Sequence, residues 1–110
     1  MVTIDEFNAI DIRVGTVVEV APFPDARKPA FQLVIDFGPD IGARRSSAQL
    51  TKRYVLADLV GRQVVAVVNF PPRRIAGFQS EVLVLGAMPA SDDVILLMPD
   101  RPTPNGSRIA

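Results

Sequence analysis

Short apolar runs that alternate residue by residue constrain the fold of this 110-residue chain more than any other feature. From Ile12 to Val20 the even positions are all β-branched, and the odd positions between them carry residues of mixed polarity. From Phe31 to Phe37 apolar side chains recur at every second position. A period of two places successive side chains on opposite faces of a β-strand. The pattern therefore predicts strands over 12–20 and 31–37.

Later runs predict further strands and one short helix. A third short strand is expected over 43–48. Apolar or β-branched residues gather in three later segments, which we also expect to be strands: 63–69, 81–85 and 94–98. Residues 51–60 lack alternation, Thr51 is a good N-cap, and Gly61 is a good residue just beyond a helix end. A helix over 51–60 is therefore expected, and Asp5-Glu6 indicates a second helix start near the amino terminus.

The order of these elements predicts an all-β fold. Five antiparallel strands with a short helix between the third and fourth form the plan of an OB-fold barrel. Ten prolines and seven glycines are spread along the chain between the apolar runs, and there is no linker or repeat. Residues 1–110 are therefore expected to be one domain. The residues after Leu85 exceed what such a barrel requires. This C-terminal extension, with its apolar run 94–98, covers either a second copy in a homodimer or its own barrel.

Absent residue types exclude most catalytic chemistry. The chain has no Cys, His or Trp, so disulfides and His- or Cys-based metal, haem and iron–sulfur sites are excluded. Serine–histidine and cysteine–histidine catalysis also needs an imidazole. No glycine-rich nucleotide loop occurs, and Asp92-Asp93 has no third carboxylate nearby in sequence. We therefore expect a binding protein without cofactor or metal, rather than an enzyme.

The formal net charge of zero conceals an uneven distribution. Residues 1–43 sum to −4, residues 44–74 to +6 and residues 75–110 to −2. Ten of the twelve cations are Arg, which favours forked contacts to carboxylate or phosphate. Neutrality excludes a generally basic protein but leaves a local cationic surface in the middle of the chain.

The sequence also predicts where the protein resides. No stretch approaches the roughly 18 apolar residues of a membrane helix. Acidic Asp5 and Glu6 stand where a signal peptide would carry basic residues. A cytoplasmic protein without membrane insertion is expected.

The stretch Asn69-Phe-Pro-Pro-Arg-Arg74 is the most distinctive. Two prolines cannot donate ladder hydrogen bonds, so the strand ends and the chain turns at the surface. The turn would expose Phe70 beside two guanidinium groups, with Phe78 shortly after. Such a surface suits base stacking or an unfolded segment with apolar and acidic side chains. The alternative is a turn whose Phe70 packs inward and whose arginines are merely solvated.

Arg44-Arg-Ser-Ser47 carries the other candidate groups. In a regular strand one Arg and one Ser of this run face outward, where they would hold a carboxylate, a carbonyl or a phosphate. An ordinary solvated strand face explains the same pattern. Lys52-Arg53 opposes the dipole at the predicted helix start, but two exposed charges on a helix are most often solvated.

Several motifs resemble one known family. They are Asp11-Ile-Arg-Val-Gly15, Phe23-Pro24, Asp36-x-Gly38, Asn69-Phe-Pro-Pro-Arg73 and Ile75-x-Gly77-x-x-Ser80. Together they are similar to the tRNA-binding domain family, OB-fold modules that are attached to methionyl-tRNA synthetases or occur as free-standing dimers. Four segments resemble one branch of it, the CsaA export-related chaperones: 33–38, 46–54, 66–78 and 80–86. The resemblance covers essentially the whole chain.

The resemblance implies a homodimeric OB-fold protein that binds peptide segments of exported preproteins. Two departures from the tRNA-binding pattern favour peptide over RNA. Ser80-Glu-Val-Leu83 replaces the usual Ser-x-Gly-Met and brings in an acidic side chain, and Phe23 replaces the His of the first turn.

Two hypotheses follow. In the first, an ATP-independent chaperone binds unfolded or preprotein segments and assists export, with the export translocase as a candidate partner. In the second, the same basic face binds tRNA, and Arg44, Arg53, Arg73 and Arg74 contact phosphates. The candidate peptide- or tRNA-binding residues are Arg44, Ser46, Asn69, Phe70, Arg73, Arg74, Phe78 and Ser80.

Overall fold

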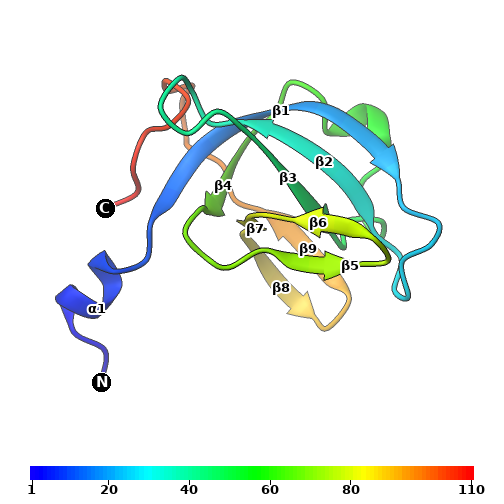
Figure 1. The fold of residues 1–110 in the computed structure, drawn as a ribbon, viewed down its shortest axis with the longest axis horizontal. Coiled ribbons are helices and arrows are strands. Elements are labelled where there is room, and N and C mark those ends of the chain that lie inside the picture. Colours follow the sequence, from blue (N-terminus) through cyan, green and yellow to red (C-terminus); the bar gives the residue numbers. More distant parts are fainter.

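Five antiparallel strands form one curved sheet that nearly closes into a barrel (Figure 1). The computed structural model describes residues 1–110. The strands lie in the order β3-β2-β1-β4-β7, with these bounds: β1 Ile12–Pro22, β2 Phe31–Asp36, β3 Ala43–Ala48, β4 Gln63–Val67 and β7 Leu83–Val84. With a short helical turn between β3 and β4, this is the predicted OB-fold.

Two hairpins and two short helical segments complete the chain. The hairpins are β5 (Arg73–Ile75) with β6 (Phe78–Ser80), and β8 (Gly86–Ala90) with β9 (Asp93–Leu96). The helical segments are α1 (Ile4–Asn8) and the 3-10 turn η1 (Leu56–Asp58). Neither of them has the length or the apolar character to cross a membrane.

A β-bulge in β1 interrupts the predicted regular alternation over 12–20. Val17 pairs with Ile35 and Glu19 with Val34, so Val18 is an extra residue and lies exposed. Val17 is fully buried in the core. A bulge bends its strand and increases its twist, and here it lies in the strand that pairs with both β2 and β4.

The barrel core requires Gly15 on β1. A Cβ there would lie 2.6 Å from Ile35 Cγ2 and 2.8 Å from Phe37 Cδ1, both in fully buried side chains. Real Cβ atoms do not approach this closely, so only glycine lets the two large side chains fill the barrel. Leu33, Leu59 and Val64 complete the most deeply buried part of the cluster.

The predicted helix over 51–60 is wrong in extent and type. Residues 51–53 form a turn, Val55 is extended with ψ 164°, and only Leu56–Asp58 are helical, as a 3-10 turn. The Asp58 carboxylate accepts a hydrogen bond from the Val55 backbone N–H at 3.0 Å, a local bond that competes with a longer helix. Gly61 has a φ of +86°, which agrees with its predicted position beyond the end of the helical segment.

The C-terminal extension packs on its own barrel with one face only. Leu96 is buried in the core and Val94 packs against it, whereas Ile95, Leu97 and Met98 are exposed. Residues 103–109 then run beside β1, where Gly106 donates to the Val14 carbonyl at 2.7 Å. The extension therefore covers its own barrel and still presents an open apolar face.

Candidate binding groove

A groove of about 670 Å³ lies between the two hairpins. Its floor is formed by the end of β3 and by β7, and its walls by the β5–β6 segment and by the β8–β9 hairpin. Phe70, Leu83 and Met88 line it and are 45%, 48% and 60% exposed. Large apolar side chains that face solvent together in a hollow are characteristic of binding surfaces.

The β5–β6 hairpin splits the two arginines of the distinctive stretch. Arg73 pairs with Ser80 and Arg74 with Gln79, so alternation places the two guanidinium groups on opposite faces. Arg73, Ile75 and Ser80 line the groove, and Arg74 does not. The groove therefore contains one of the two arginines.

The side chains of Ser80 and Glu81, at the end of β6, bond to β3 where a regular strand ladder is missing. The Arg45 N–H donates to Glu81 Oε1 at 3.0 Å, and the Ser47 N–H donates to Ser80 Oγ at 3.0 Å. The Glu81 N–H in turn donates to the Arg45 carbonyl at 2.7 Å. Glu81 and Ser80 thus act as the acceptors that a neighbouring strand would supply, and they close the barrel beside the groove.

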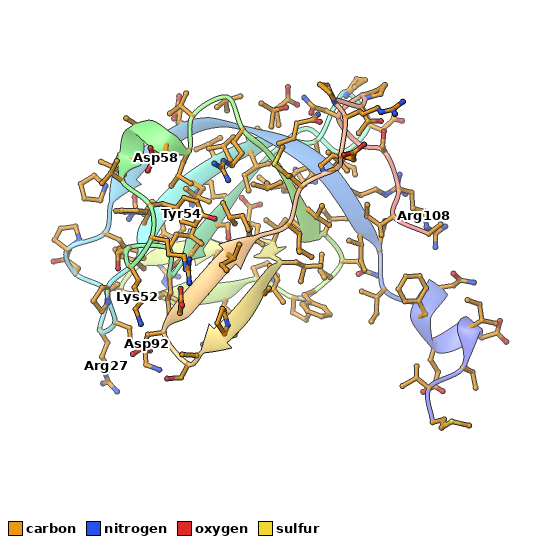
Figure 2. The ribbon with its side chains drawn as sticks, turned by 180° about the vertical axis from the view of Figure 1, so that it is seen from behind. Arg27, Lys52, Tyr54, Asp58, Asp92 and Arg108 are labelled. Carbon is orange, nitrogen blue, oxygen red and sulfur yellow. The ribbon has the colours of Figure 1, made fainter.

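An ion pair docks the β8–β9 wall. Arg53 donates to both carboxylate oxygens of Asp93, with Nη2 to Oδ2 at 2.7 Å. These hydrogen bonds lower the pKa of the Asp93 carboxyl below its usual 3.8, against an opposing effect of desolvation, and they raise the pKa of Arg53. One residue along, the Tyr54 hydroxyl accepts from the Leu96 N–H at 3.1 Å, and Figure 2 shows Tyr54 beside this hairpin.

Three predicted site residues lie in the groove, and three more lie elsewhere on the surface. Phe70, Arg73 and Ser80 line it. Arg74 is exposed on the far face of its hairpin, and Arg44 lies at the start of β3, whereas the groove lies at its end. Asn69 precedes the groove, and its amide bonds the Asp11 N–H and the Ala9 carbonyl instead.

Two predicted site residues are buried, which corrects their assignment. Ser46 is 0% exposed, and its hydroxyl donates to the Val82 carbonyl, because its parity on β3 points it into the barrel. Phe78 is 9% exposed and packs against Phe23, with ring centroids 5.3 Å apart. Phe23 is buried in the same cluster, so it adds no apolar ring to the surface, contrary to our interpretation of the first turn.

Arg45 is the outward-facing arginine of the Arg44-Arg45 pair, and Arg53 is held in an ion pair instead of being solvated. The Arg45 guanidinium lies over the Phe78 ring, 4.8 Å from the centroid, and is exposed. Arg53 is paired with Asp93, so a phosphate would have to compete with a buried carboxylate for it. Of the four arginines that the second hypothesis assigns to phosphates, Arg53 is the one that already forms an ion pair with a carboxylate.

Leu83 and Met88 are groove residues that sequence reasoning missed. Leu83 belongs to the predicted strand 81–85, and apolar residues in strands are normally assigned to the core. Met88 lies between the predicted strands 81–85 and 94–98, in a strand, β8, that the sequence did not predict. Their exposure depends on how β7 and β8 leave the barrel, and no local pattern reports this. No group of three acidic side chains gathers to hold a metal ion.

Comparison with known proteins identifies the family. Residues 12–108 match the family model described as a putative tRNA binding domain. The chain belongs to the tRNA-binding domain family. Two solved structures confirm the predicted CsaA branch of the family. The chaperone CsaA of Bacillus anthracis is 54% identical with a TM-score of 0.95, and the match covers 100% of this chain and 99% of that one. The CsaA chaperone protein of Picrophilus torridus is 50% identical with a TM-score of 0.92, and both chains are covered completely.

Longer relatives contain the same module. The methionine–tRNA ligase of Methanothrix thermoacetophila is 38% identical over 99% of this chain, and that of Porphyromonas gingivalis is 35% identical over 98%. This chain spans only 16% and 15% of those two ligases. The similarity therefore concerns one module of each ligase.

Proposed function

We propose that this protein is an ATP-independent chaperone that binds unfolded or preprotein segments in the groove and assists their export. The observation that carries the proposal is the exposure of Phe70, Leu83 and Met88 in one hollow. Burying such side chains against a client supplies the main driving force for association. The similarity to CsaA chaperones supports the same function.

The groove fits an extended segment with apolar and acidic side chains. Apolar side chains contact the Phe70, Leu83 and Met88 surfaces, and an acidic side chain pairs with Arg73 at the edge. Ser47, Gln49 and Ser91 line the same groove and offer polar groups to a peptide backbone. The chain has no nucleotide-binding loop, so release occurs by competition or by handover, for which the export translocase is the candidate acceptor.

We propose further that the protein works in the cytoplasm as a homodimer. The exposed face of the β8–β9 segment, with Ile95, Leu97 and Met98, is a candidate contact between two copies. The chain acts by binding and carries out no reaction.

A second candidate function is tRNA binding, which the family description favours. Arg44, Arg45, Arg73 and Arg74 supply positive charge, and the Arg45 guanidinium stacks on Phe78. Against this function, Arg73 and Arg74 lie on opposite faces of their hairpin and Glu81 adds an acidic group to the groove. These features make peptide the better-supported ligand.

Truncation of exposed groove residues tests the proposal. Phe70→Ala and Leu83→Ala should each weaken binding of a labelled, permanently unfolded polypeptide by about 1 kcal/mol, roughly fivefold, because each half-exposed side chain loses its contact. Fluorescence anisotropy measures the affinity. The matched control is Val60→Ala, an equally exposed apolar residue outside the groove. Equal losses for all three variants would contradict the site assignment, and tRNA binding in the absence of polypeptide binding would favour the second candidate.

A further inference from the structure

The C-terminal strap, defined as residues 103–109, covers the part of β1 that β2 leaves free (Figure 1). β1 pairs with β2 only from Thr16 onward, whereas it pairs with β4 over its first half. On the free side the Val14 N–H donates to the Ser107 carbonyl at 2.9 Å, and the Gly106 N–H donates to the Val14 carbonyl at 2.7 Å. The strap thus supplies the backbone partners that β2 does not reach.

The strap contains the only Asn-Gly pair of the sequence, Asn105-Gly106. In such a pair the backbone nitrogen of the glycine attacks the side-chain amide carbon of the asparagine, because glycine has no Cβ to hinder the approach. The attack closes a cyclic succinimide and releases ammonia. Water then opens the ring to aspartate or to isoaspartate, in which the main chain runs through the former side chain. The other two asparagines, Asn8 and Asn69, precede residues with side chains, which hinder this attack.

Hydrogen bonds to the barrel restrain both reacting groups of this pair. The Gly106 nitrogen donates its proton to the Val14 carbonyl. Asn105 Oδ1 accepts from Thr16 Oγ1 at 2.7 Å and from Gln63 Nε2 at 3.3 Å. Ring closure requires the amide carbon to swing toward the nitrogen, and it requires the nitrogen to give up both its hydrogen bond and its proton. The closed strap therefore opposes the reaction, and local opening, which costs less than global unfolding, removes the restraint.

The backbone around the pair is packed too closely to accept a longer chain. A Cβ on Gly106 would lie 2.6 Å from the Phe37 carbonyl oxygen, and a Cβ on Gly38 would lie 2.6 Å from the Asn105 carbonyl oxygen. Gly106 also has a φ of +90°, a conformation that suits glycine. Isoaspartate inserts an extra atom into the main chain, so the residues after it would lose their register with β1. Aspartate inserts none, and its carboxylate accepts from the same two donors.

We propose that Asn105-Gly106 is a deamidation site that converts a transient opening of the strap into a permanent one. The reaction proceeds in the opened strap and needs no reagent other than water. Its isoaspartate product does not close again, so the first half of β1 keeps an open edge, and open strand edges pair with other chains. The rate of deamidation follows the fraction of molecules whose strap is open. This site is independent of the groove and of the proposed function.

Ageing of the folded protein beside a peptide of residues 101–110 tests the site. Both are incubated at mildly alkaline pH, which favours loss of the proton from the attacking nitrogen, and peptide mass spectrometry follows conversion of the amide to the acid. We expect conversion at Asn105 ahead of Asn8 and Asn69, and more slowly in the protein than in the peptide. A protein that reacts as fast as the peptide, or that reacts first at Asn8 or Asn69, would overturn the proposal.

Loosening the strap should accelerate the reaction. Arg13→Gln does so without touching the Asn105 amide, because Arg13 Nη1 donates to the Gly106 carbonyl at 3.0 Å. This variant should deamidate several-fold faster than the wild type. The matched control, Arg101→Gln, removes an exposed arginine that pairs only with exposed Asp100 and should leave the rate unchanged. Wild type in urea below its unfolding transition should also react faster, which needs no variant. Equal rates for wild type and Arg13→Gln, or a rate that urea does not change, would contradict the role of strap opening.

Hydrogen exchange shows whether the product can close. The isoaspartate form, isolated by ion-exchange chromatography, should lose the protection of the Val14 and Gly106 amide protons, both of which the strap contacts hold. Asn105→Asp carries the same added charge on an unaltered main chain and should keep that protection. An isoaspartate form protected as well as Asn105→Asp would show that the strap closes again and would refute the permanent opening.

Discussion

Ala76 holds the one non-glycine positive φ of the chain, at 46°, in the loop of the β5–β6 hairpin. Gly77 beside it has a φ of +79°. Two-residue hairpin loops with both residues at positive φ favour Asn-Gly, because Asn tolerates the left-handed region better than Ala. The hairpin that carries Arg73 therefore contains a local strain at one residue.

Replacing this alanine should relieve the strain. Ala76→Asn is expected to raise the free energy of unfolding by about 0.5–1 kcal/mol, because the left-handed backbone costs asparagine less. Thermal and urea unfolding measure the change. Ala76→Val is the opposing control, since a β-branched side chain tolerates this region poorly, and it should destabilise. Stabilisation by both variants would show that backbone conformation at this position is not the cause.

Single residues also show where sequence reasoning stops. The stretch 69–74 predicts an exposed aromatic beside an arginine, and Phe70 and Arg73 fulfil this in the groove. In Arg44-Arg-Ser-Ser47 the sequence predicts that one serine faces inward but not which one, because the phase of a strand depends on its partners. The structure buries Ser46 and leaves Ser47 in the groove. The burial of Phe78 depends likewise on Phe23, which is distant in sequence.

At the scale of elements, alternation predicted β2 well, and it failed where long-range packing decides. The bulge at Val18 bends and twists β1 within the barrel, and no local signal in the valine-rich run reports it. The segment 51–60 has helical features, yet Arg53 and Tyr54 are drawn to β9 and the chain keeps only a 3-10 turn. Contacts across about 40 residues of sequence therefore override a local propensity.

The packing of the β8–β9 hairpin on the barrel should depend on the Arg53–Asp93 ion pair. Asp93→Asn removes the charge, weakens both hydrogen bonds from Arg53 and should lower the melting temperature. Asp92→Asn is the matched control, since Asp92 is exposed in the adjacent turn and pairs with no cation. Equal melting temperatures for the two variants would show that the ion pair does not stabilise the fold.

The pH dependence of the difference between these variants follows from the pKa of Asp93. The pKa is lower in the folded protein than its usual 3.8, so the unfolded chain binds the proton more readily. The stabilisation by the ion pair is therefore complete above pH 3.8 and is lost as the pH falls below it. Melting curves of wild type and Asp93→Asn should converge in that acidic range and stay parallel near neutrality. A difference that grows on acidification would contradict this sign.

On the scale of the whole molecule, the folded structure disperses the basic third of the sequence. Arg73 lies in the groove, Arg74 on the opposite hairpin face, and Arg44 at the far end of β3. Arg53 is paired with Asp93. A segment of charge +6 thus yields a groove with a single arginine, beside which Glu81 lies, so the groove lacks the several cations that a run of phosphates would need.

The salt dependence of the affinity distinguishes the two candidate ligands, tRNA and polypeptide. Each phosphate neutralised on a duplex contributes about −0.9 to the slope of log affinity against log salt concentration. If Arg44, Arg45, Arg73 and Arg74 all contact phosphates, tRNA binding should have a slope of about −3.6, four times that value. Polypeptide binding in the groove involves Arg73 alone and should change little with salt. Arg74→Gln should make the tRNA slope shallower by about 0.9 and leave polypeptide affinity unchanged, whereas Arg73→Gln should weaken both ligands. A polypeptide affinity that falls as steeply with salt as that of tRNA, and that drops in Arg74→Gln, would mean that the client binds across the dispersed arginines rather than in the groove.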